Sequence, residues 1–420
     1  MGQGAEPGEG NFCSTKKAKR LMRIFTICNK SPWPANEGGS IAMNAIIEGL
    51  LDAGHQVKVL AVNSDKYSVD TDSIPIEYRK KTDFETAYLK LKPNPVHAFL
   101  NLFSSKSYNI QRFICPKMER QIINILKENT FDVVNLEMLH TTPYIDIIRK
   151  YSDAAIVLRA HNIEHLIWER IAGSARNPLK RFYTRHLART LKKYELEVLS
   201  KVDGIAAITS TDGDFFRKHN PQLPVADIPF GITSTFDADA EAECEFPSLF
   251  HLGSMNWIPN SDGIRWFLDE VWPGVHSAFP DLKFYLAGRH MPEWLLNRND
   301  PNVINVGEVD SAKRFLHSKA IMIVPLLSGS GIRIKIIEGM KEGKAIISTT
   351  IGAEGIDYSA GKDIFIADNS EEFVEAIKKL TADKAFCDSI GNNARKTIRE
   401  KYDNRVVTSK LVDFYQSLIK

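Results

Sequence analysis

Short, continuous apolar runs alternate along this chain with longer segments in which apolar residues recur every three or four positions. The first two runs are RIFTICN at 23–29 and GHQVKVLAV at 54–62, and a helical pattern from about Ile41 to Ala53 separates them. Continuous apolar runs are typical of strands buried on both faces, whereas the longer period is typical of amphipathic helices. The alternation therefore predicts an α/β fold built on parallel, doubly wound sheets.

The alternation occurs in both halves of the chain. After the polar, irregular residues 64–118, the apolar runs of the first half lie at 131–137, 154–160, 204–210 and 225–232. Those of the second half lie at 248–253, 281–290, 303–310, 321–325 and 344–348. Because 420 residues suffice for two domains of about 200 each, we expect two Rossmann-like domains. The expected divisions are a disordered extension (1–21), an N-terminal domain (22–234), a C-terminal domain (246–402) and a helix that crosses back onto the N-terminal domain (403–420).

The segment 321–347, IMIVPLLSGSGIRIKIIEGMKEGKAII, carries the most chemistry. Its pattern predicts a strand, a Ser/Gly turn, a helix from about Gly331 and a second strand. Such a helix places Gly331, Lys335 and Glu338 on a polar face, opposite an apolar one. A glycine loop at a helix N-terminus offers free N–H groups and the positive end of the helix dipole, which suits a diphosphate.

Three side chains of this segment add to that chemistry. Arg333 and Lys335 would bring positive charge to a bound diphosphate, and Glu338 is placed to accept hydrogen bonds from two ribose hydroxyls. The dinucleotide fingerprint GxGxxG is incomplete, because isoleucine stands at position 334. An ordinary βαβ unit with a charged outer face is therefore the alternative interpretation.

The same segment resembles the donor-binding element of the family 4 retaining glycosyltransferases, the glycosyl transferases group 1 of polysaccharide biosynthesis. Glu338 matches the second of two glutamates in the family pattern, and Gly339, Met340 and Gly343 match the residues that follow it. Ser330 stands where the first glutamate would be. A branch of the family carries small residues there, followed by a Gly-x-Arg-x-Lys run that GIRIK at 331–335 reproduces.

The resemblance implies a GT-B fold, in which two domains face each other across a cleft, and it assigns further site residues. RAHNIE at 159–164 resembles a run whose histidine, here His161, points into the cleft beside the transferred sugar. A histidine after a strand also serves as a capping or packing residue, which is the alternative. The remaining assignments are the paired-glycine loop with Gly39, the phosphate loop with Gly253 and Ser254, Arg289 near the diphosphate, and Val306, Gly307 and Val309 beside the base.

Composition indicates the charge of the expected partners and the expected location in the cell. The net charge is +2, but residues 1–231 carry +7 and the remainder carries −5, so the first half favours acidic partners. Five scattered cysteines suggest neither a disulfide framework nor a zinc site, which fits the cytoplasm. The first 20 residues lack the apolar centre of a signal peptide, and no apolar run approaches 18 residues.

A basic stripe marks the long helix expected at 178–202. Its residues recur every four positions, and they are Arg181, Arg185, Arg189 and Lys193. A solvated helix face is the simplest explanation. The functional alternative is attraction to anionic lipid headgroups on the inner face of a membrane, or to a lipid diphosphate acceptor.

These observations predict a retaining, metal-independent glycosyltransferase that moves a sugar from a nucleotide-diphosphate sugar to a saccharide or lipid-linked acceptor. No cofactor, metal or nucleic-acid partner is expected, and His161, Arg333 and Lys335 are the predicted catalytic residues. Asp212-Gly213-Asp214 resembles a metal-binding DxD, but acidic residues in the first turn of a helix explain it without metal. The competing hypotheses are a nicotinamide-dependent oxidoreductase with Asp65 as its ribose acid, and a non-catalytic bilobed sugar-binding protein.

Overall fold

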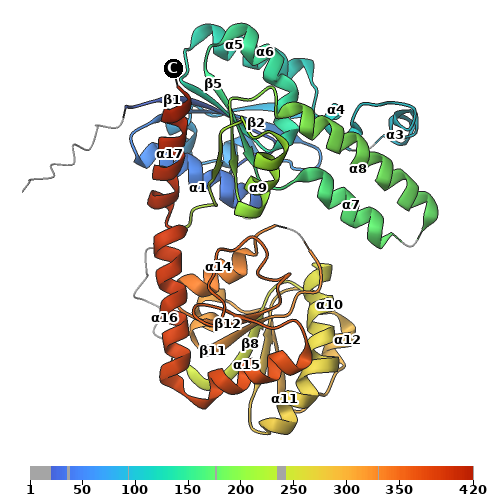
Figure 1. The fold of residues 1–420 in the computed structure, drawn as a ribbon, viewed down its shortest axis with the longest axis vertical. Helices are drawn as coiled ribbons and strands as arrows, with labels where there is room; N and C mark the ends of the chain where they lie inside the picture. The colour runs from blue at the N-terminus through green and yellow to red at the C-terminus, as the bar shows by residue number, and fades with distance from the viewer. Residues whose placement is uncertain are drawn as a thin grey trace, which may run out of the picture.

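The computed structural model describes residues 20–35, 38–92, 94–175, 177–233, 243–329 and 331–419. It contains two parallel sheets, one in each half of the chain, and helices cover both faces of each (Figure 1). The predicted fold class, two doubly wound Rossmann-like domains, is confirmed. Ser330, most of the 1–21 extension and most of the linker between the domains lie outside the described residues.

The N-terminal sheet has seven strands in the order β3-β2-β1-β4-β5-β6-β7, and each neighbouring pair is parallel. The strands are β1 (Arg23–Cys28), β2 (Gln56–Ser64), β3 (Glu85–Leu89), β4 (Val133–Glu137), β5 (Ala155–Ala160), β6 (Gly204–Ala207) and β7 (Val225–Asp227). The order reverses between β1 and β4, and open α/β sheets bind ligands at such a switch point, beyond the carboxyl ends of the strands.

The N-terminal helices lie in two layers, each with its own apolar core. One core lies beneath α5 (Pro116–Glu128), α6 (Ile145–Tyr151) and α8 (Pro178–Val198), and the other beneath α1 (Gly38–Asp52) and α17 (Asn404–Leu418). The remaining helices are α2 (Ile76–Lys81), α3 (Pro95–Asn101), α4 (Tyr108–Gln111), α7 (Glu164–Ser174) and α9 (Ser210–His219). Burial on both faces explains why β1, β4 and β5 are mostly apolar.

The C-terminal sheet has six parallel strands in the order β10-β9-β8-β11-β12-β13. The strands are β8 (Glu245–Leu252), β9 (Phe284–Ala287), β10 (Val303–Gly307), β11 (Lys319–Val324), β12 (Ala345–Ser348) and β13 (Phe365–Ile366). The helices are α10 (Ile258–Trp266), α11 (Trp272–Ala278), α12 (Glu293–Leu296), α13 (Ala312–His317), α14 (Ile334–Lys341), α15 (Ser370–Ala382) and α16 (Lys384–Lys401). Its switch point lies between β8 and β11.

The chain returns to the N-terminal domain through α16 and α17, which run end to end along one side of the molecule (Figure 1). At the crossing, the Ile232 N–H donates to the Tyr402 carbonyl at 2.8 Å, and the Asn404 N–H donates to the Ile232 carbonyl at 3.0 Å. The Asn404 side chain then donates to the Ala45 carbonyl of α1 at 2.7 Å. The crossover helix was predicted at 403–420, and the structure has α17 at Asn404–Leu418.

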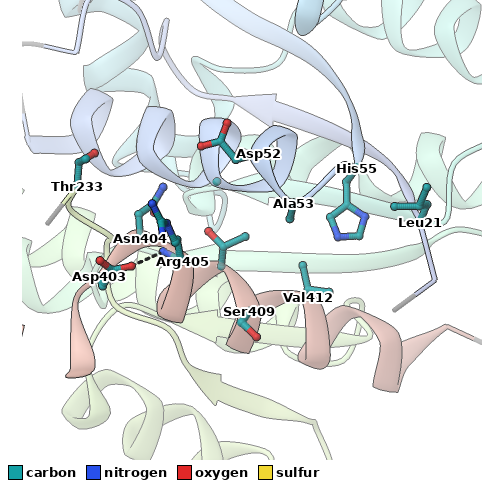
Figure 2. Close-up of a pocket in the computed structure, with 12 residues that line it drawn as sticks. Leu21, Asp52, Ala53, His55, Thr233, Asp403, Asn404, Arg405, Ser409 and Val412 are labelled. Carbon is teal, nitrogen blue, oxygen red and sulfur yellow. Dashed lines mark hydrogen bonds between the residues drawn. The ribbon is translucent and has the colours of Figure 1, made fainter. Parts of the chain in front are cut away.

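A cavity of about 350 Å³ lies where α1 and α17 run side by side (Figure 2). Thr408 approaches α1 so closely that a Cβ on Gly49 would lie 2.0 Å from its Oγ1. A glycine at position 49 is therefore required for the two helices to meet. The cavity is lined by Asp52, His55 and Arg405, which belong to the domain junction and not to the strand ends.

Three sequence interpretations need correction. The helix expected to start near Gly331 begins at Ile334, because Gly329 and Gly331 have φ of +124° and +80° and cannot continue a helix. The helix expected at 41–53 spans Gly38–Asp52, which places the paired glycines inside its first turn. Residues 64–118 were read as irregular, but they contain β3 and three helices.

None of the helices in the described part of the chain combines the length and apolar content that crossing a bilayer requires.

Candidate functional site

A cavity of about 300 Å³ lies between the domains, at the carboxyl ends of the N-terminal strands. Gly38 and Gly39 at the start of α1, His161 after β5 and Gly331 of the C-terminal domain all line it. A Cβ on Gly331 would lie 3.4 Å from Asn162 Oδ1, so the two domains meet closely here. The structure therefore brings together three of the predicted site residues from segments far apart in sequence.

The paired glycines open the cavity to the backbone of α1. Gly38 and Gly39 are the first residues of this helix, where backbone N–H groups lack helical partners and the helix dipole is positive. Beside them, the Lys30 side chain adds a cation, and a Cβ on Gly39 would lie 3.2 Å from its Cε. This end of the cavity favours an anionic ligand.

His161 is held by a carboxylate that the sequence reasoning missed. Its Nε2 lies 2.7 Å from Oε2 of Glu137, which is fully buried at the end of β4. Asn135 donates to the other carboxylate oxygen at 2.8 Å. Because an ionised carboxylate only accepts hydrogen bonds, Nε2 carries the proton in this hydrogen bond. The other ring nitrogen, Nδ1, is not part of the contact with Glu137. Glu137 is the last residue of β4, and β4 borders the switch point of the sheet. A glutamate at the end of an apolar run, as in FDVVNLE, is the sequence signal that could have identified this residue.

The charge of Glu137 is stabilised in spite of its burial. Burial raises the pKa of this carboxyl, but the hydrogen bond from His161 and the charges of His161 and Arg159 outweigh burial and hold the pKa below its usual value. Arg159 is itself fully buried, with its Nε 3.8 Å from Glu137 and its Nη1 and Nη2 donating to the carbonyls of Ile228 and Pro229 at 3.3 Å. A fixed, oriented imidazole results.

Glycines let the strand ends of the C-terminal domain come together. A Cβ on Gly288 would lie 1.9 Å from the carbonyl oxygen of Gly253, and its own φ is +148°. Gly253 donates to the Ala287 carbonyl at 3.0 Å, and Gly288 donates to the Gly307 carbonyl at 2.7 Å. The predicted phosphate loop with Gly253, the Arg289 loop and the Gly307 loop therefore form one continuous edge.

Ser254 and Arg289 lie at the same edge. The Arg289 carbonyl accepts from the Met255 N–H at 2.9 Å and from the Ser254 hydroxyl at 3.4 Å. Arg289 is exposed at the surface of this loop. Its neighbour His290 has a φ of +60°, a backbone conformation that is sparsely populated outside glycine and that clusters at binding sites.

Lys335 reaches this edge from α14. Its Nζ donates to Asn260 Oδ1 at 2.8 Å and lies 3.3 Å from Nε2 of His251, and a Cβ on Gly253 would be only 2.5 Å from it. His251 Nδ1 donates to the Ile323 carbonyl at 2.8 Å, which leaves Nε2 as an acceptor facing the lysine. Burial, followed by the Arg333 charge, lowers the pKa of Lys335 to about 7.

Arg333 folds back onto its own loop. Its guanidinium donates to the Gly331 carbonyl and lies 5.5 Å from the centre of the Trp257 ring. The side chain is buried, and a Cβ on Gly329 would lie 2.8 Å from its Nη2. Arg333 therefore shapes the glycine loop in this structure.

Glu338 lies one turn beyond Ile334, which lines the interdomain cavity. Its side chain is exposed, yet desolvation by the surrounding protein raises the pKa of the carboxyl. The charge of Lys341 lowers this pKa to a smaller extent, and the charge of Glu342 raises it. Val306 is exposed and Val309 is half-buried near the β10 edge. Ser330 lies outside the described residues.

The acidic residues of the alternative interpretations, Asp65 and Asp212, make local structural hydrogen bonds. Asp65, the acid that an oxidoreductase would require, accepts from the backbone N–H groups of Leu91 and Lys92 at 2.7 and 3.3 Å. Asp212 lies in the first turn of α9, where its N–H donates to the Thr209 hydroxyl at 3.0 Å. Within the described residues, no three His, Cys, Asp or Glu side chains gather into a metal-binding group.

One ion pair links the domains beside the cavity. Arg170 of α7 donates to Glu354 at 2.8 Å and to the carbonyl of Gly329 at 3.3 Å. Glu354 follows β12 of the C-terminal domain, and Gly329 belongs to the donor-binding loop predicted from the sequence. The contact therefore couples the N-terminal domain to that loop.

The second domain matches a known protein family. Residues 246–383 match the family described as glycosyl transferases group 1. This domain is a glycosyl transferases group 1 domain. The two facing Rossmann-like domains are the GT-B fold, and this fold together with the matching domain supports glycosyl transfer from a nucleotide sugar, the activity that the sequence predicted.

Solved structures share the fold of this chain at low sequence identity. Sucrose-phosphate synthase from Thermosynechococcus elongatus superposes with a TM-score of 0.65 and 15% identity, over 94% of this chain and 99% of that one. HepE from Anabaena, in complex with UDP, superposes with a TM-score of 0.61 and 12% identity, over 94% and 100%. A protein of the cps region of Klebsiella pneumoniae is 23% identical over 93% of this chain and 99% of its own length.

Proposed function

We propose that this glycosyltransferase is retaining and metal-independent, and that it moves a sugar from a nucleotide-diphosphate sugar to a saccharide or lipid-linked acceptor. The observation that carries the proposal is the interdomain cavity, where the α1 N-terminus, the carboxylate-held His161 and the Gly331 loop meet. The cps-region relative favours an acceptor from polysaccharide biosynthesis.

The donor diphosphate would lie along the edge formed by Gly253 and Arg289. Lys335 and Arg289 supply cations there, and Gly253 leaves room for the Lys335 ammonium, because a Cβ at position 253 would lie 2.5 Å from its Nζ. As the sugar leaves, negative charge grows on the diphosphate, and preorganised cations stabilise such charge more in the transition state than in the ground state. This role needs no metal ion. Arg333 would add charge from the glycine loop that it orders.

The nucleoside would lie toward β10 and α14. Glu338 would accept from two ribose hydroxyls, while the backbone near Val306, Gly307 and Val309 would contact the base. UDP is bound by the HepE protein of the same fold. A uridine nucleotide is therefore the first donor to test on this chain.

His161 would line the transferred sugar. Because the Nε2–H group donates its hydrogen bond to Glu137, Nδ1 and the face of the ring would contact the sugar hydroxyls. Glu137 acts through His161 and is a positioning residue. His161→Ala is expected to lower kcat on the order of a hundredfold or more, because a misplaced sugar loses its alignment with the acceptor.

Transfer in the presence of EDTA tests the proposal. The protein is incubated with a panel of nucleotide sugars and with saccharide and lipid-linked acceptors, and product is followed by mass spectrometry. Turnover that persists in EDTA, with the anomeric configuration of the donor kept in the product by NMR, supports it. Loss of turnover on chelation with rescue by Mn²⁺ or Mg²⁺, or an inverted product, would overturn the corresponding part.

A further inference from the structure

The short helix α3 presents its apolar face to solvent. Val96, Phe99 and Leu100 share one face of α3, Phe103 lies in the turn just after it, and each of the four is at least 58% exposed. Amphipathic helices of a globular protein normally turn such a face toward the core. Asn94 caps α3 by accepting from two backbone N–H groups, and Pro95 fixes its first residue, so the helix is well defined.

The N-terminal half of α8 adds two more exposed apolar side chains on the same flank of the domain. Leu179 and Phe182 are 79% and 67% exposed. They share a face of α8 with His186, at spacings of three and four residues, and His186 contacts the Asn101 carbonyl of α3 at 3.0 Å. Figure 1 shows α3 beside α8 on the flank of the N-terminal domain. The six residues Val96, Phe99, Leu100, Phe103, Leu179 and Phe182 therefore lie on one flank of the N-terminal domain, which is here named the α3–α8 surface.

The segments that carry this surface have a one-sided charge. Residues 86–118 and 170–194 contain 13 of the 54 Lys and Arg residues of the chain and none of its 52 Asp and Glu residues. Arg181, Arg185 and Arg189 are exposed and follow the face of α8 next to Leu179 and Phe182. A cavity of about 560 Å³ beside Leu100 is lined by Lys90, Lys92 and Arg112, among others. Cations thus surround the apolar residues.

We propose that the α3–α8 surface docks the protein onto a phospholipid bilayer that carries anionic headgroups. Exposed aromatic and leucine side chains would enter the boundary between headgroups and acyl chains, and the surrounding Lys and Arg would meet the phosphates. Contiguous exposed apolar residues mark interaction sites, and the absence of carboxylates from both segments favours a uniformly anionic partner over a protein surface of mixed charge.

This docking differs from the basic stripe expected from the sequence. Lys193 belongs to that stripe, but its Nζ lies 3.9 Å from a carboxylate oxygen of Glu197. It also lies more than two helical turns along α8 from Phe182, so it is not part of the α3–α8 surface. The apolar residues of α3, which the sequence reasoning passed over, supply the membrane insertion. The inference does not depend on the transfer reaction, because vesicle binding needs neither donor nor acceptor.

Vesicle flotation of the full chain tests the proposal. Wild-type protein is expected to float with vesicles of phosphatidylcholine and phosphatidylglycerol, and to remain unbound with phosphatidylcholine alone. The variant Phe99→Ser/Phe103→Ser removes apolar insertion, and Arg181→Glu/Arg185→Glu reverses two cations. With each cation near the surface contributing about fivefold, the second variant should bind roughly 30-fold more weakly or worse. Both should keep the wild-type melting temperature, since all four side chains are exposed.

Matched changes on the C-terminal domain serve as controls. Ile258 and Leu296 are 70% and 58% exposed there, and Lys378 and Lys379 are exposed on α15. Ile258→Ser/Leu296→Ser and Lys378→Glu/Lys379→Glu should float like the wild type. The proposal is wrong if the wild type fails to float with anionic vesicles at low salt, or if the control variants lose binding equally. A concentration-dependent dimer that Leu179→Ser/Phe182→Ser dissociates, without vesicle binding, would instead assign the surface to a second copy of the chain.

Discussion

At the scale of single residues, Lys335 should make donor binding depend on pH. Burial lowers its pKa to about 7, so the amine loses its charge as the pH rises through 7 in the empty protein. A nucleotide sugar keeps a constant charge over this range, and it binds the protonated amine. Its affinity should therefore fall above pH 7, approaching tenfold per pH unit.

Titration calorimetry of a nucleotide sugar between pH 6 and 9 measures this dependence. The Lys335→Ala variant should bind more weakly at pH 6 and show a flattened profile. Equal slopes for the wild type and the variant would mean that another group, and not Lys335, titrates with binding.

Glu338 makes a second residue-scale prediction. As an ionised carboxylate that accepts from two ribose hydroxyls, it would make hydrogen bonds worth roughly 1.5 to 3 kcal/mol each. Glu338→Ala should weaken nucleoside-diphosphate binding on the order of tenfold to a thousandfold. Because the side chain is exposed, the melting temperature without ligand should stay unchanged.

The control for Glu338→Ala is Glu375→Ala, an exposed glutamate on α15 away from the cleft. The pKa of Glu338 is raised, so wild-type affinity should also decline as the pH falls through that raised value and the carboxylate becomes protonated. Matching dissociation constants for the wild type and Glu338→Ala would remove Glu338 from the site.

Residue chemistry was only partly visible in the sequence. His161 was identifiable because it follows a strand end, where α/β folds place ligands. Its partner Glu137 was read simply as part of a strand, because strand periodicity does not reveal a buried polar network that crosses from β4 to β5. The contact of Lys335 with His251 and Asn260 likewise joins residues more than 70 positions apart, and no local pattern encodes it.

At the scale of elements, the glycine edge of the C-terminal domain should tolerate no side chain. A Cβ at Gly288 would lie 1.9 Å from a backbone oxygen at a φ of +148°. Gly288→Ala should therefore destabilise the protein by about 1 to 3 kcal/mol and weaken donor binding, since the phosphate loop must shift. Urea denaturation and nucleotide titration check both effects.

Gly173→Ala is the matched control for Gly288→Ala. Gly173 lies in α7, and a Cβ there would meet nothing within 4 Å. The same substitution should leave stability unchanged or raise it by about 0.5 to 1 kcal/mol. If Gly288→Ala behaves like this control, the edge is looser than its geometry implies.

Periodicity predicted most elements but misplaced those whose limits depend on backbone conformation. Most β strands were evident because burial on both faces makes them largely apolar, whereas β3, which is only partly buried, was missed. The start of α14 was set three residues too early, because positive φ at Gly329 and Gly331 ends regular structure before Ile334. α3 was missed because it is only seven residues long and its apolar residues face solvent. The sequence reading looked for apolar stripes that pack against a core.

At the scale of the whole molecule, the Arg170 contact should restrict the domains. The pair with Glu354 is exposed, so its loss should change the free energy of unfolding by under about 1 kcal/mol. It nevertheless joins two domains, and Arg170→Ala should broaden their relative orientation. Small-angle X-ray scattering should show a larger radius of gyration for the variant without ligand, and a value equal to the wild type with donor bound.

Arg149→Ala is the control for this change. Arg149 pairs with Asp203 at 2.7 Å within the N-terminal domain, and its exposure is similar. It should leave the scattering curve unchanged. Identical curves for wild type, Arg170→Ala and Arg149→Ala would show that the interdomain pair does not constrain the cleft.

The general architecture followed from sequence because two sets of alternating strands and helices admit few arrangements. The set of residues that line the cleft could not be predicted from the sequence, because it depends on how two separately folded domains meet. The central claim is that this cleft binds a nucleotide-sugar donor.

Melting temperatures measured with a panel of ligands test that claim most directly. At a ligand concentration of a hundred times Kd, binding stabilises the folded protein by about 2.7 kcal/mol. A nucleoside diphosphate and its nucleotide sugar should raise the melting temperature of the wild type more than that of Glu338→Ala, whereas NAD and free sugars should leave both unchanged. A rise with NAD or with a free sugar, and none with any nucleotide sugar, would contradict the claim.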